Sequence, residues 1–213
     1  MYNTAVGYNA GNAITTGTVN TLVGGLCGDA ITTGDSNVAV GYLALSSATT
    51  ASDNTAVGGA ALNVNTTGAS NVAVGHQALD ANTTASNNTA IGYGSLDANT
   101  TGASNTALGF SSLSANTTGT LNTALGTQAL STNTTASNNT ALGSSVLATN
   151  TTGTNLVGVG YLALHGNTTG TSNVAIGHQA MLTTSTGGSN VGIGHAALYN
   201  NTTASNNTAV GSA

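Results

Sequence analysis

Three of the four histidines share one position of a repeated pattern, which makes them the first candidates for chemistry. His76, His178 and His195 each follow a glycine, and other repeats place tyrosine or phenylalanine there. A column of planar side chains is typical of stacking between coils, and we favour that interpretation. If the column faced a threefold axis, His178 and His195 from three chains would supply ligands for a transition metal.

Asp80 and Asp97 occupy the same position in two consecutive repeats, and no other two carboxylates of the chain do so. Stacked in adjacent coils they would be roughly 5 Å apart. Calcium takes more oxygen ligands than this, and glycoside hydrolysis needs a carboxylate pair held in a cleft. We therefore predict solvated surface charges, no cofactor and no catalytic residues. No G-x-S-x-G nucleophile motif occurs either, so the chain is not expected to be an enzyme.

Paired threonines recur in every repeat except the one that has Ser185 at the first position, and they give the clearest signal outside catalysis. The second threonine of the pair, as in Thr67 and Thr84, is threonine in every repeat. Three interpretations stand: a structural hydroxyl ladder, an ice-binding array, and a site of glycan attachment. The Asn-Thr-Thr sequences match the N-glycosylation sequon at Asn65, Asn99 and Asn167, although a motif built into a turn would match by construction.

Cys27 is the only cysteine, so the chain cannot form an internal disulfide. It stands at a position that most repeats fill with alanine. A small buried residue is therefore expected rather than a reactive thiol.

The elements that position these residues follow from a repeat of 17 residues. One glycine column has no insertion or deletion and runs through Gly7, Gly24, Gly41, Gly58, Gly75, Gly92, Gly109, Gly126, Gly143, Gly160, Gly177, Gly194 and Gly211. Residues 1–213 are therefore predicted to form a single continuous repeat array, as a segment of a longer fibre.

Each repeat contains two short apolar segments separated by glycine and by Asn-Thr-Thr, which predicts two short strands and two turns per coil. Val74 belongs to a column of Val, Ile or Leu, and Leu79 to a column of Leu. We expect these two columns to meet in the core. One coil alone cannot offset its ordering entropy, so stability must come from stacking. The fold class is therefore all-β, a parallel β-roll or β-solenoid of about 12 coils.

Alternation along the first segment places Asn71, Ala73 and Gly75 on the face opposite Val74. The Ala73 column is nearly all small, which predicts that it packs closely against another chain. Stacked Asn71-type amides can form a hydrogen-bonded ladder, or they can serve turn chemistry alone.

Composition excludes two kinds of partner. The chain has no Lys or Arg and a formal charge of −5, so neither nucleic acid nor anionic lipid is an expected partner. Its apolar runs are too short to cross a bilayer, so no membrane insertion is expected.

Units such as residues 71–79 followed by Asn82-Thr83-Thr84 resemble the repeats of tail-fibre-type proteins, and also the shorter head repeats of YadA-like trimeric autotransporter adhesins. The resemblance covers essentially the whole chain. It implies a left-handed β-roll assembled as a homotrimer, extracellular, on a virion or cell surface. Such shafts mediate attachment to a host-surface receptor or glycan. The alternative function is an ice-binding or other surface-binding β-solenoid that uses the Thr ladder.

Overall fold

The computed structural model describes residues 2–212 as a parallel β-solenoid, and the predicted fold class is confirmed. It contains two compact units, Met1–Asn105 (unit 1) and Thr106–Ala213 (unit 2). Unit 1 holds β1 (Thr4–Val6), β2 (Thr21–Val23), β3 (Val38–Val40), β4 (Thr55–Val57), β5 (Val72–Val74) and β6 (Thr89–Ile91). Unit 2 holds β7 (Thr106–Leu108), β8 (Thr123–Leu125), β9 (Thr140–Leu142), β10 (Val157–Val159), β11 (Val174–Ile176), β12 (Val191–Ile193) and β13 (Thr208–Val210).

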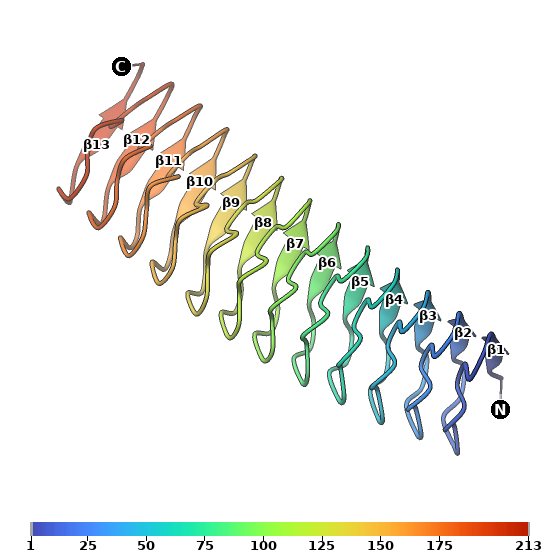
Figure 1. Ribbon diagram of the computed structural model, residues 1–213. Helices are drawn as coiled ribbons and strands as arrows, with labels where there is room; N and C mark the ends of the chain where they lie inside the picture. Colours follow the sequence, from blue (N-terminus) through green and yellow to red (C-terminus); the bar gives the residue numbers. More distant parts are fainter. Residues whose placement is uncertain (1, 213) are drawn as a thin grey trace. The chain divides into compact units, whose positions relative to one another are not determined.

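Within each unit every strand pairs in parallel with the next one in the sequence (Figure 1). The register advances by one whole repeat, so Ala73 lies opposite Ala56 in β4 and Ala90 in β6. Identical positions therefore form straight columns along each unit.

Each coil contains one strand, and the second strand expected per coil is not formed in the described residues. The segment around Leu79 is a series of turns because its backbone enters the left-handed region: Gln77 has φ 56° and Leu79 has φ 53°. Its backbone amides donate hydrogen bonds alternately to the preceding and the following coil. Gln77 N–H donates to the Gly59 carbonyl of the preceding coil, and Leu79 N–H donates to the Ser95 carbonyl of the following coil. The segment thus bonds to both neighbours without being a strand.

The glycine after each strand is required by a close approach between coils. Gly75 has φ 135°, and a Cβ placed on it would lie 2.5 Å from the carbonyl oxygen of Gly92. No L-residue side chain fits there, so the invariant glycine column is a consequence of coil stacking.

The interior of the coil is narrow and holds a Leu column together with small residues. Leu79 and Ala73 are both fully buried, which confirms the expected Leu core. The first two coils fill the interior differently. Gly11 and Gly28 stand at the position of the core leucine, and the side chains of Leu22, Ile14 and Ile31 occupy the space that the leucine fills in other coils. A Cβ on Gly28 would lie 2.9 Å from both Leu22 and Ile31.

Two asparagine ladders occupy the rest of the interior, and their amides are hydrogen-bonded from coil to coil. Asn71 Nδ2 donates to Asn54 Oδ1 at 3.2 Å and to the Ala85 carbonyl at 2.9 Å. Asn82 Nδ2 donates to Asn65 Oδ1 at 2.8 Å. Buried amides of this kind are tolerated only when they are bonded. The ladder expected for the Asn71 column is therefore present, and a second ladder accompanies it.

Candidate functional site: the exposed strand face

The outer surface of the strands is the most distinctive exposed feature of both units. In β5, Ala73 is buried while Val72 and Val74 are part-exposed, and the same pattern holds from β2 to β12. We call the outward residues of the strands, the first and third of each, the strand face. It combines a Thr or Val column with a Val, Ile or Leu column.

This arrangement reverses the sequence prediction for the strand. The Val74 column was expected to line the core, but it is exposed, with Ile91 36% and Leu142 43% accessible. The Ala73 column was expected to pack against another chain, but it faces the interior of its own coil, so both expectations are wrong. The physical reason is volume: Leu79 and the asparagine ladders already fill the coil, and only a small side chain fits beneath the strand.

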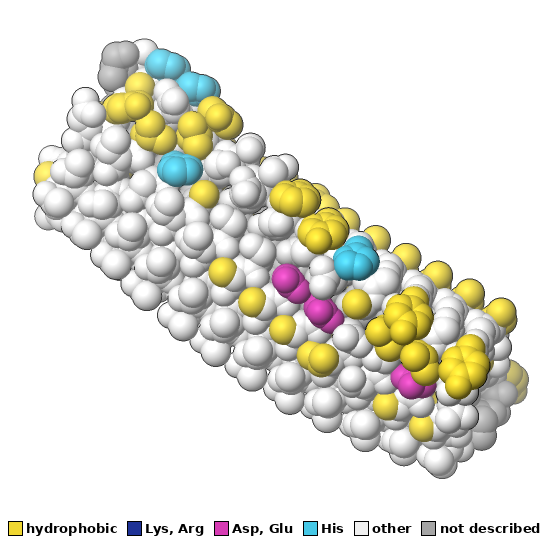
Figure 2. All heavy atoms as spheres, in the orientation of Figure 1, with side chains coloured by type: hydrophobic (Ala, Val, Ile, Leu, Met, Phe, Trp, Pro, Cys, Tyr) yellow, Lys and Arg dark blue, Asp and Glu magenta, His cyan; other side chains and the backbone are white. Residues whose placement is uncertain are grey.

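The strand face is apolar and carries no charge. None of its Thr, Val, Ile and Leu side chains is ionisable, and the chain has no Lys or Arg. The face drawn in Figure 2 carries no dark blue and only a few magenta side chains. Contiguous apolar surfaces larger than a few hundred Å² are uncommon on monomeric soluble proteins and mark interaction sites. Within each unit the Val, Ile and Leu side chains of the strand face follow one another from coil to coil in register.

The two threonine columns have different environments. The first donates hydroxyl hydrogen bonds between coils, as from Thr66 Oγ1 to the Thr83 carbonyl at 3.0 Å. The second, which includes Thr67 and Thr84, is exposed at a bend. The hydroxyl ladder is therefore made by the first column. The sequon asparagines Asn65, Asn99 and Asn167 are fully buried, which blocks glycan attachment to the folded chain at these sites.

The aromatic and histidine column lies just after each strand and is exposed. His76 and Tyr93 stack with centroids 5.6 Å apart and planes 8° apart. His178 and His195 stack at 5.2 Å and 7°. Stacking between coils, the interpretation favoured from the sequence, is confirmed.

As a metal site, His178 and His195 supply two ligands in one chain, fewer than the three or four protein ligands that hold zinc. Between residues 2 and 212 no group of three or more His, Cys, Asp or Glu is placed to hold an ion. A metal site shared by three chains stays a prediction.

Asp80 and Asp97 are half-buried rather than fully solvated. Burial, together with the negative charge of Asp80, raises the pKa of the Asp97 carboxyl, and the nearby His76 partly offsets this rise. Asp80 Oδ1 is enclosed without a hydrogen-bond partner. Burial and the negative charge of Asp80 therefore both disfavour the ionised form of the Asp97 carboxyl group.

Cys27 is fully buried, as predicted, and its Sγ lies 3.0 Å from the Ala39 carbonyl oxygen. Burial raises the pKa of its thiol to about 11, with a smaller contribution from Asp29. Because the thiolate is the reactive form, this residue is inert in the folded chain.

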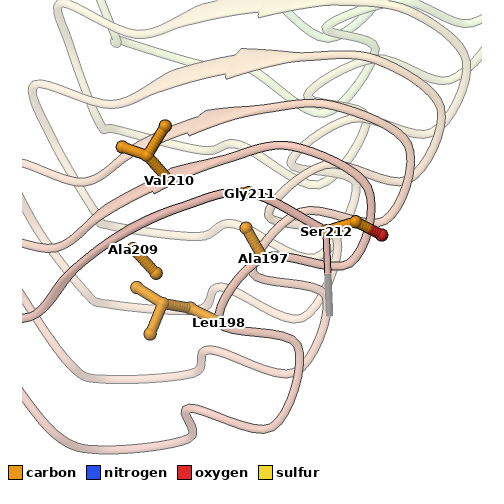
Figure 3. Close-up of a pocket in the computed structure, with 6 residues that line it drawn as sticks. All are labelled: Ala197, Leu198, Ala209, Val210, Gly211 and Ser212. Atoms are coloured by element: carbon orange, nitrogen blue, oxygen red, sulfur yellow. The ribbon is translucent and has the colours of Figure 1, made fainter.

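A hollow of about 180 Å³ lies at the last coil of unit 2 (Figure 3). Leu198 and Ala209, which line it, occupy the interior columns that the following coil covers elsewhere in the unit. The hollow is therefore the uncovered core of the final coil, and its lining offers no polar side chain beyond Ser212.

No family model, no curated protein and no solved structure matches the chain. The likeness to tail-fibre and YadA-like repeats rests on the repeated residues alone. None of the described residues belongs to a helix long and apolar enough to cross a membrane.

The strand face is the feature that the sequence-based prediction assigned wrongly, because it placed these side chains in the core. Strict alternation identified its residues as one set but did not say which set faces inward. The Asn71 column, which is asparagine in every repeat except at Leu156, was the available signal, because hydrogen-bonded ladders of buried amides favour the interior and its side chains share a face with Ala73.

Proposed function

We propose that the chain is a non-catalytic fibre segment that self-associates through its strand faces. The observation that carries the proposal is the uncharged Val, Ile and Leu column, which is exposed or part-exposed on every strand. Burying such side chains gives about 25 cal/mol per Å² of apolar surface removed from water. Because the column repeats with the coil, a second copy meets a matching surface in each unit.

The assembly that we propose is a homotrimer, which is what the resemblance to tail-fibre and YadA-like repeats implies. A threefold arrangement turns one face of each chain toward a common axis and leaves the Thr67 bends and the aromatic column accessible. The proposed setting is extracellular, on a virion or a cell surface, where the shaft projects or mediates attachment to a host-surface receptor or glycan.

Light scattering coupled to size exclusion tests the assembly. The full chain is expected at three times the monomer mass. Leu125→Glu places a charge on the strand face and should yield monomers, because an unpaired buried carboxylate is strongly disfavoured. Thr118→Glu, on the exposed second threonine column, is the matched control and should remain trimeric. A monomeric parent chain would overturn the proposal.

Ice binding is a second candidate, favoured by one specific observation. β7, β8 and β9 each present Thr beside Leu on the strand face, in register and without charge. The Thr67 column considered from the sequence lies at a bend, so an ice-binding array would use Thr106, Thr123 and Thr140 instead. Freezing-point hysteresis that is lost in Thr123→Tyr and kept in Thr118→Tyr would support it, whereas a trimer without hysteresis supports the fibre.

A further inference from the structure

Rings and glycines alternate along the exposed column that follows the strands of unit 1. The six positions hold Tyr8, Gly25, Tyr42, Gly59, His76 and Tyr93. The rings are exposed, with Tyr8 76% and Tyr42 62% accessible. Over the first five coils a ring therefore stands at every second coil.

The glycines provide space for these rings to lie against the backbone. A Cβ on Gly25 would lie 3.5 Å from Cδ2 of Tyr42, and one on Gly59 would lie 3.3 Å from Cδ2 of His76. Each of these two rings thus leans over the glycine of the preceding coil. Because adjacent coils are about 4.8 Å apart, rings at every second coil repeat at roughly 10 Å.

This spacing and chemistry match one class of ligand. Extended chains of equatorially linked pyranoses present the same face at every second sugar, with a repeat close to two coils, and the C–H groups of that face pack on aromatic rings. With no Lys or Arg in the chain, nothing here pairs with an anionic polymer. A neutral glycan carries no charge that would need a cationic partner.

Hydrogen-bonding groups flank the rings. Gln77 follows His76 directly, and the Asp97 carboxyl group lies near His76. An amide and a carboxylate both accept hydrogen bonds from hydroxyl groups. An exposed ring beside such acceptors offers the two kinds of contact that a sugar requires.

We propose that the ring column of unit 1, formed by Tyr8, Tyr42 and His76, binds a neutral, extended, equatorially linked glycan lying along the direction of coil stacking. This glycan site specifies the attachment role proposed above: it rests on that role only in that it names the ligand to which the fibre attaches. The strand face itself is left for assembly.

Isothermal titration of the full chain with cellohexaose and chitohexaose tests the inference. Binding to one or both is expected, and no binding to maltohexaose, whose axial linkages coil the chain. Tyr42→Ser and His76→Ser should each raise Kd about tenfold. Both variants should fold, since Ser144 and Thr127 occupy the same column in unit 2. Tyr161→Ser, the same change outside the alternating rows, is the matched control and should leave Kd unchanged.

Three outcomes would overturn the inference: no binding to either equatorially linked hexasaccharide, equal binding of maltohexaose, or Kd unaffected by Tyr42→Ser and His76→Ser. Light scattering on the same samples separates this failure from that of the proposed assembly. A trimer that binds no glycan refutes the glycan site alone, and a monomer that binds glycan refutes the assembly alone.

Discussion

Core volume is exchanged between neighbouring coils at two places in unit 2. Gly158 replaces alanine at the middle position of β10, where a Cβ would lie 2.5 Å from Cγ1 of Val146. Gly192 replaces alanine at the middle position of β12, where a Cβ would lie 2.8 Å from Cγ of Met181. In each case a glycine accommodates a side chain of different shape in the preceding coil: Val146 stands where most coils have alanine, and the longer, unbranched Met181 stands where they have leucine. The narrow interior is therefore packed to constant volume.

Gly158→Ala is expected to lower the free energy of unfolding by about 1 to 3 kcal/mol, because it overfills the core against Val146. Adding Val146→Ala restores the Ala–Ala pair found elsewhere in the array, as at Ala129 and Ala141, and should recover most of the loss. Urea denaturation of both single variants and the double variant measures the coupling. A double variant no more stable than Gly158→Ala would contradict the volume exchange.

Leu121 occupies an unfavourable backbone position at the surface. It has φ 58° and is 60% exposed, whereas Asn87 and Asn138 fill the same column in other coils with φ 62° and 61°. Left-handed conformations cost most L-residues about 1 to 2 kcal/mol, and asparagine tolerates them best.

Leu121→Asn should therefore raise the free energy of unfolding by about 1 kcal/mol or less. The reverse change Asn138→Leu, also at an exposed site, should lower it by a similar amount. Denaturation midpoints compare the two. A loss of stability in Leu121→Asn would show that the exposed leucine makes a stabilising contact.

At the scale of the element, the turns after β5 and β6 bring titrating groups of adjacent coils together. The raised pKa of Asp97 comes first from burial, then from the charge of Asp80, against the opposing effect of His76. An acid with a raised folded pKa binds its proton more tightly in the folded state. Its contribution to stability is full below the unfolded pKa and is lost as pH rises through the folded pKa.

Asp97→Asn is therefore expected to stabilise the chain at neutral pH and to reduce the gain in stability that the parent shows on acidification. Asn12 and Asn63 occupy the same column, so the amide is compatible with the fold. Denaturation midpoints between neutral and acidic pH measure both effects. Asp53→Asn, at an exposed carboxylate, should leave the slope unchanged, and equal slopes for the parent and Asp97→Asn would refute the assignment.

For the whole molecule, the sequence predicts the repeat and its columns better than it predicts their orientation. Constant spacing identifies the Gly75, Leu79 and Asn71 columns, because each depends on stacking identical positions. The second strand was predicted because a second short apolar segment, bounded by turn residues, contains Leu79. Leu79 reaches the core with a left-handed φ of 53° instead, a conformation that leucine rarely adopts. The prediction assigned the inward and outward faces of the strand the wrong way round. Alternation separates the residues into two faces, but it does not tell which face points inward until the volume of the interior is known.

Assembly through the strand faces also predicts how the whole molecule unfolds. If folded copies associate and unfolded copies do not, mass action raises the melting midpoint with protein concentration. Thermal unfolding followed by circular dichroism over a wide concentration range should show this rise for the parent and for Thr118→Glu, and a constant midpoint for Leu125→Glu.

Proteolysis gives a second measurement of the same dependence. Trypsin cannot serve as the protease, because the chain has no Lys or Arg and is not cleaved even when it is unfolded. Thermolysin can serve. A midpoint and a thermolysin survival time that are both independent of concentration would leave the exposed Val, Ile and Leu column to a partner other than a second copy.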